Sequence, residues 1–126
     1  MSQTYIILRL MAEAQNADQA ESEVIRMTPQ IEAYAEIKKY LVEQYWKIPS
    51  YQEITLYLLP RGDTNETYNS LIAFAGDGWT HDGDQSDGWS RGSVWNPKPG
   101  LVLLSPRVKW AELSLWRPDV ENEQVH

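Results

Sequence analysis

The sequence predicts a single α+β domain in which a mostly antiparallel sheet carries two helices from the N-terminal half of the chain packed on one face. Helical spacing of apolar residues is confined to residues 16–46, and short runs typical of strands fill most of the remainder. Helices segregated from a run of strands indicate an α+β architecture. The 126 residues, 42% hydrophobic and 23% charged, have the size and composition of one globular domain. We expect it to span residues 1–118, followed by a flexible acidic tail over residues 119–126.

The first two elements are a strand and a helix. Residues 4–11 alternate with apolar side chains on both faces, which predicts a central strand covered by helix on at least one side. The first helix is expected over residues 16–27. Asn16 is its predicted N-cap, and Gln19 occupies the capping-box position three residues later.

A second, longer helix is predicted from residue 28 to about residue 46. Thr28 followed by Pro29 is a helix-start signal, and Pro49 ends the element because the residue before a proline avoids the α conformation. The apolar residues that support this helix recur at helical spacing and are Ile31, Tyr34, Ala35, Leu41, Val42 and Tyr45.

The second half of the chain is predicted to consist of strands separated by turns. A short helix is an alternative for the strand over residues 68–75, and a helix beginning at Ser105 is an alternative for the strand over residues 108–116. In the last strand, Trp110 and Trp116 would lie on the sheet face without helices, partly exposed or covered by the loop over residues 76–92. The expected strands are residues 51–59, 68–75, 93–95, 101–104 and 108–116.

Composition excludes several functional classes. The chain has no cysteine, so a disulfide framework, a thiolate metal site and a cysteine nucleophile are ruled out. Its net charge of −7 argues against direct nucleic-acid binding through a broad basic face and suits a basic protein partner. The N-terminal residues lack the features of a targeting signal, and no apolar run is long enough for a membrane span. We therefore expect a cytoplasmic protein without membrane contact.

Residues 76–95 form the most biased segment of the chain. They hold four aspartates, five of the seven glycines and three of the six tryptophans, and the tripeptide Asp-Gly-Trp occurs twice. Acidic and aromatic side chains on a glycine-rich loop suit recognition of a basic partner, with carboxylates pairing to its cations and tryptophans serving as anchors. A plain hairpin loop, with the tryptophans folded back onto the sheet, is the structural alternative. The predicted partner-binding residues are Asp77, Trp79, Asp82, Asp84, Asp87 and Trp89.

Metal binding and catalysis have weaker support in this segment. Residues 82–88 resemble the start of a calcium loop, but Asp87 stands where that loop requires glycine and Ser93 where it requires glutamate. His81 has no second histidine nearby. Paired carboxylates and aromatics would suit a carbohydrate-binding protein or a glycosidase, yet no complete catalytic signature occurs. We expect no cofactor, no metal and no catalytic residue.

The chain resembles the immunity proteins that bacteria make against their own delivered toxins, particularly those of contact-dependent inhibition systems. The resemblance is carried by small size, acidic charge, the absence of cysteine, abundant tryptophan and the pattern W-A-E-L-S-L-W over residues 110–116. It implies a cytoplasmic antitoxin that binds and neutralises a cognate toxin domain through protein–protein interaction. The acidic surface makes a basic nuclease the expected partner. The alternative is a small-molecule or carbohydrate-binding protein or enzyme that uses the Trp/Asp loop over residues 76–95.

Overall fold

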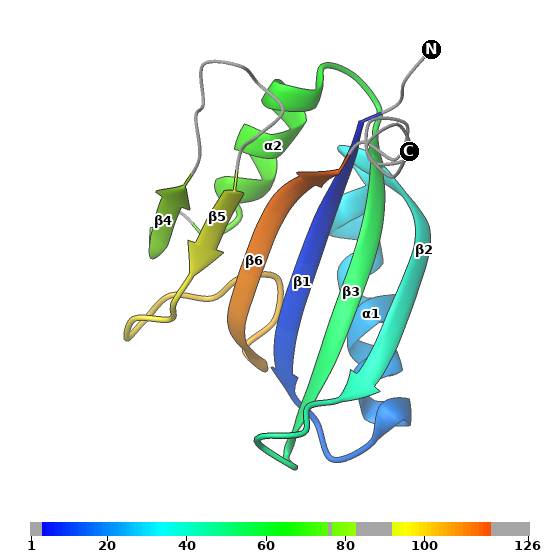
Figure 1. The fold of residues 1–126 in the computed structure, drawn as a ribbon, viewed down its shortest axis with the longest axis vertical. Helices are drawn as coiled ribbons and strands as arrows, with labels where there is room; N and C mark the ends of the chain where they lie inside the picture. The colour runs from blue at the N-terminus through cyan, green and yellow to red at the C-terminus, as the bar shows by residue number, and fades with distance from the viewer. Residues whose placement is uncertain (1–3, 76, 83–91, 117–126) are drawn as a thin grey trace, which may run out of the picture.

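A computed structural model describes residues 4–75, 77–82 and 92–116 of the chain, and the predicted acidic tail lies outside these residues. In chain order the described elements are six strands with two helices placed among them (Figure 1). They are β1 (Tyr5–Glu13), α1 (Ala17–Glu32), β2 (Ala35–Gln44), β3 (Tyr51–Pro60), α2 (Thr64–Ile72), β4 (Trp79–Asp82), β5 (Gly92–Trp95) and β6 (Val108–Trp116).

All six strands form one antiparallel sheet in the order β2-β3-β1-β6-β5-β4. Strand β1 lies in the middle and pairs with both β3 and β6, as its apolar faces predict. The part β2-β3-β1-β6, with α1 after β1 and α2 after β3, has the split β-α-β connectivity of ferredoxin-like folds. The hairpin β4–β5 is inserted before the last strand and widens the sheet beyond β6. The predicted α+β class is confirmed.

Both helices pack on the same face of the sheet. Helix α1 lies behind the sheet in Figure 1, whose viewer looks onto the opposite face. Tyr68 and Leu71 of α2 belong to the same buried cluster as Val24 and Met27 of α1. The inward-facing residues of β1 complete this core at alternating positions, and they are Ile6, Leu8, Leu10 and Ala12. The described part of the chain thus has one continuous core and one sheet face without helices.

The predicted second helix is wrong, because its residues divide between the end of α1 and strand β2. Helix α1 begins at the predicted Asn16 cap, whose side chain accepts from the Gln19 amide at 2.9 Å, and it continues past Pro29 to Glu32. Pro29 cannot donate to the carbonyl of Ile25. Ile25 lies on the solvent side of the helix, 72% exposed, where water can satisfy that carbonyl.

Strand β2 has apolar spacing that imitates a helix because it contains a bulge. Its pairing with β3 skips one residue between Ile37 and Lys39. Ala35, Ile37, Tyr40 and Val42 therefore share the inward side at intervals of two, three and two residues. An edge strand also buries little of its length, so the alternation that identifies a strand is weak.

The predicted strand over residues 68–75 is also wrong, and the alternative short helix is present as α2. Asp63 caps this helix by accepting from the Glu66 amide at 3.0 Å. Residues 101–104 do not form a ladder strand; a single bridge joins Leu103 to Ser105. The strands predicted at 51–59, 93–95 and 108–116 are confirmed with ends shifted by at most one residue. Neither described helix has the length and apolar content needed to cross a membrane.

Candidate functional site

The first Asp-Gly-Trp tripeptide is a tight connection between α2 and β4. Gly78 adopts a φ of 97°, and its carbonyl accepts from the Asn96 amide at 3.1 Å. The Asp77 carbonyl accepts from the indole N–H of the buried Trp95 at 2.8 Å. Trp79 packs half-buried against the core and donates its own indole N–H to the Ile72 carbonyl at 3.0 Å. This tripeptide therefore anchors Trp79 and Trp95 to the fold, and for Trp79 this agrees with the structural alternative.

The other predicted partner-binding residues are placed less completely. Asp77 is exposed, with its carboxylate 3.7 Å from the Lys98 ammonium. Asp82 ends strand β4, but its side chain is outside the described part of the structure. Asp84, Asp87 and Trp89 also lie outside the described residues. Their role in recognition stays a prediction.

The acidic surface of α1 is smaller than its sequence implies, because Glu23 is buried. Its carboxylate accepts from the Ser105 hydroxyl at 3.1 Å and lies 3.3 Å from Arg107 Nε. Ser105 also accepts from the Arg107 amide at 3.2 Å. Glu23 thus fastens the β5–β6 connection to α1 and has a structural role.

A chain of hydrogen bonds joins α2 to the hairpin β4–β5. His81 and Ser93 are paired across the hairpin, with His81 Nδ1 2.8 Å from Ser93 Oγ. Ser93 Oγ lies 2.8 Å from the Tyr68 hydroxyl, which in turn donates to the Leu113 carbonyl at 2.9 Å. A serine in contact with a histidine is the arrangement of an activated nucleophile, so the direction of these hydrogen bonds decides what the chain can do.

In the hydrogen-bond pattern of the described residues, His81 donates to Ser93. A carbonyl can only accept, so the single hydroxyl hydrogen of Tyr68 is directed at Leu113. The hydrogen between Tyr68 and Ser93 must then come from Ser93, and Nδ1 of His81 must donate to Ser93 Oγ. A histidine that donates cannot remove the serine proton, and Ser93 is itself buried. The arrangement is therefore a structural relay.

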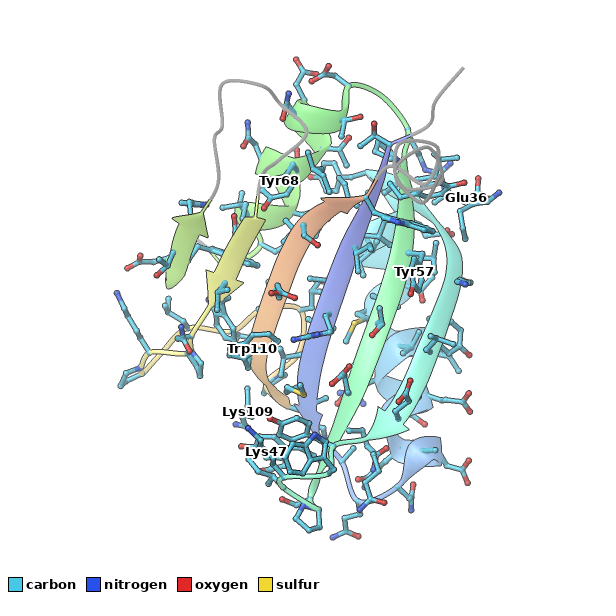
Figure 2. All side chains as sticks on the ribbon, viewed as in Figure 1. Glu36, Lys47, Tyr57, Tyr68, Lys109 and Trp110 are labelled. Carbon is cyan, nitrogen blue, oxygen red and sulfur yellow. The ribbon has the colours of Figure 1, made fainter. Side chains whose placement is uncertain are left out.

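We call the sheet face without helices the open face; Tyr57 and Trp110 lie on it (Figure 2). Residues of β1, β3 and β6 that alternate with the core positions point to this face. They include an unusual share of aromatic side chains and a central arginine. Residues of the open face include Tyr5, Arg9, Met11, Tyr51, Glu53, Tyr57, Trp110, Glu112 and Trp116.

Two aromatic groups occupy the open face. Toward the end of the sheet where β1 begins, the rings of Tyr5 and Tyr57 each lie 5.7 Å from the ring of Trp116. The Lys39 ammonium stands 4.7 Å above the Tyr57 ring. A shallow cavity of about 190 Å³ adjoins this aromatic cluster, and Lys38 is a further residue of its wall.

The second group forms a larger cavity, the open-face groove, of about 570 Å³. The connection between β2 and β3 supplies one wall, Trp110 of β6 supplies another, and β1 and β3 lie between them. Trp46 in this connection is 80% exposed, the most exposed large hydrophobic side chain of the described residues. The residues that line the groove are Arg9, Met11, Tyr45, Trp46, Ile48, Tyr51, Glu53 and Trp110.

Arg9 is held in the groove by weak contacts. Its guanidinium carbon lies 5.2 Å from the centre of the Trp110 ring, and Nη2 lies 3.7 Å from the Glu112 carboxylate, which is longer than a hydrogen bond. Nε is buried and has no hydrogen-bond partner among the described residues. A buried donor without an acceptor costs about 1–3 kcal/mol. Sequence reasoning placed Trp110 and Trp116 on this face but missed the groove, because Trp46 had been assigned to a helix.

Neither the search for metal-binding groups nor the comparisons with known proteins indicate a function. Among the described residues, no three histidine, aspartate or glutamate side chains lie close enough together to hold a metal ion. The chain matches no family model, and comparisons with curated proteins and with solved structures found no significant match. The resemblance to immunity proteins stays a prediction.

Proposed function

We propose that this protein is an immunity-type inhibitor that binds and neutralises a cognate toxin protein, and that the open face is its main contact surface. The observation that carries this proposal is the cluster of tryptophan, tyrosine and arginine side chains on a sheet face that no described helix covers. These three residue types dominate the energetic centres of protein–protein interfaces. A sheet presents them on a rigid backbone, which keeps the entropic cost of binding low.

The acidic character of the chain contributes a second element of the proposal. A net charge of −7 accelerates encounter with a basic partner such as a nuclease domain in the cytoplasm. Asp77 is exposed at the far edge of the sheet, beside β4. In this proposal the Trp/Asp loop over residues 76–95 raises the association rate through its aspartates, whereas the open face determines the lifetime of the complex.

A small-molecule or carbohydrate ligand is the second candidate, and the open-face groove favours it. Its volume of about 570 Å³ lies within the range typical of ligand sites, and its aromatic walls suit stacking on a sugar ring. The ligand site of this candidate is the open face rather than the Trp/Asp loop, because the indole of Trp79 is hydrogen-bonded within the fold.

Co-expression tests the inhibitor proposal. The protein would be produced together with the protein encoded by the reading frame directly upstream of its own gene, and growth and binding would be measured. We expect protection of the cells and a stable complex. Trp46→Ala should weaken the complex at least tenfold without lowering the melting temperature, because Trp46 is mostly exposed. Ile25→Ala, at a similarly exposed apolar position on α1, is the matched control and should change affinity less than twofold.

Two further measurements separate the alternatives. Changing Asp77, Asp82, Asp84 and Asp87 together to lysine should slow association and reduce its salt dependence. An unchanged association rate would remove the Trp/Asp loop from the proposal. If the protein gives no protection and sugars raise its melting temperature, the small-ligand candidate replaces the inhibitor.

A further inference from the structure

We infer that the open-face groove docks an extended segment of the partner protein that carries an acidic side chain between apolar ones, with Arg9 as the anchor for its carboxylate. This inference rests on the proposed function and names the chemistry of the contact. It is carried by three observations: the incomplete hydrogen bonding of Arg9, the cations already held on both tryptophan walls, and the apolar lining of the groove.

The hydrogen-bonding state of Arg9 calls for an acceptor. An arginine presents a planar fork of N–H donors that matches the two oxygens of a carboxylate. In the structure, Nη2 is 3.7 Å from Glu112 Oε1, and Nε is buried without a partner among the described residues. The side chain is still 40% exposed. An incoming carboxylate can therefore reach a guanidinium whose position is already set by Trp110.

The tryptophan walls argue against a basic side chain as the occupant. The ring of Trp110 faces the Arg9 guanidinium at 5.2 Å, and the ring of Trp46 faces the Lys47 ammonium at 5.1 Å. Figure 2 shows Lys47 at the end of the open face where Lys109 and Trp110 also lie. A partner cation would meet like charge at both rings, whereas an anion is attracted to both cations.

The rest of the lining suits the flanking residues of such a segment. Met11 is almost fully buried, and Tyr45, Ile48 and Tyr51 offer apolar surface beside it. Glu53 is the acidic residue of the lining, and its carboxylate can accept from backbone N–H groups of an extended segment. A net acidic protein can therefore use its overall charge to attract a basic partner and a local cation to fix one acidic residue of that partner.

Peptide binding to the full-length protein tests the site itself. Three blocked peptides, Ac-Leu-Asp-Leu-NH2, Ac-Leu-Asn-Leu-NH2 and Ac-Leu-Lys-Leu-NH2, would be titrated into ¹⁵N-labelled protein and followed by NMR. The aspartate peptide should shift the Arg9 Nε–H and Trp110 indole N–H signals, with a Kd on the order of 1 mM for so small a ligand. The asparagine peptide should bind at least fivefold more weakly, and the lysine peptide should not shift these signals.

Variants of Arg9 show whether the guanidinium is the anchor. Arg9→Gln should abolish the response to the aspartate peptide, and Arg9→Lys, which keeps the charge but lacks the planar fork of donors, should weaken it several-fold. Arg26→Gln on α1 is the matched control and should bind as the wild type does. A thermal melt of each variant confirms that it folds. Equal binding of the three peptides, or a response that survives Arg9→Gln, overturns the inference.

The same variants in the co-expression assay separate this inference from the proposed function. If the wild type protects cells and Arg9→Gln protects equally well, the anchor is wrong while the inhibitor proposal stands. If the aspartate peptide binds at Arg9 but the protein protects against no toxin, the groove stands and the inhibitor proposal falls. Tighter binding of oligo(dT) than of the aspartate peptide at the same signals would identify a nucleic-acid platform and overturn protein docking.

Discussion

Gly78→Ala should be among the most destabilising single substitutions in the connection between α2 and β4. A Cβ atom at this position would lie 2.7 Å from Trp95 Nε1 and 2.9 Å from the Asn96 carbonyl oxygen. Neither neighbour can easily move, because Trp95 is fully buried and the other contact is backbone. In addition, the φ of 97° is a conformation that alanine rarely adopts.

The expected cost follows from these two contributions. The left-handed backbone costs an alanine about 1–2 kcal/mol. Overpacking against a fixed neighbour costs about 1–3 kcal/mol. Alanine recovers about 0.4–1 kcal/mol through a less flexible unfolded chain. The net loss is about 3 kcal/mol, which lowers the urea midpoint by roughly 2 M if the slope is about 1.5 kcal/mol/M.

Other glycines of the chain isolate each contribution. Gly100 has a φ of 87° but open space around its Cβ position, so Gly100→Ala should cost only about 1 kcal/mol. Gly62 has open space and no positive φ, so Gly62→Ala should be neutral or slightly stabilising. Urea unfolding followed by tryptophan fluorescence measures all three variants. Equal losses for Gly78→Ala and Gly100→Ala would refute the clash with Trp95.

Three further predictions concern the polar contacts of the core. Tyr68→Phe should cost about 2 kcal/mol in urea unfolding, because the buried hydrogen bond from Tyr68 to the Leu113 carbonyl is lost; a loss below about 0.5 kcal/mol would contradict the relay. The ring ¹⁵N shifts of His81 should show a protonated Nδ1 at neutral pH, and an unprotonated Nδ1 would reverse the deduced direction of its bond to Ser93. Glu23→Gln should cost about 1 kcal/mol, because the amide can still accept from the neighbouring serine while the two arginines remain solvated; no loss at low salt would argue against an ionic contribution.

Residues of the candidate site could be predicted from the sequence where apolar and polar side chains alternate regularly along a strand. The pattern of residues 108–116 placed Trp110 and Trp116 opposite the core, and the sheet confirms this. Trp46 could not be placed in the same way, because the bulge gives the preceding strand β2 the spacing of a helix, and the predicted helix extended to Trp46. Two signals in the sequence could have corrected the predicted helices. Asp63, with Glu66 three residues later, marks the start of helix α2. Pro29 lies inside helix α1, so a proline did not have to mark the start of a separate helix.

By itself, the sequence determined the central position of strand β1, the helix cap at Asn16 and the antiparallel α+β class. These depend on local spacing and on capping groups a few residues apart, which the chain displays directly. Only the tertiary structure decided that Trp46 and Trp110 wall the same groove and that Arg9 lies between them. These contacts join strands that are distant in the sequence, and their register depends on a bulge and on a hairpin connection that no local pattern specifies. Trp79, the first tryptophan of the acidic segment over residues 76–95, packs against the core and is not free to bind a partner. The surface best suited to binding is instead the open-face groove, whose residues come from separate strands and the β2–β3 connection and form no motif in the sequence.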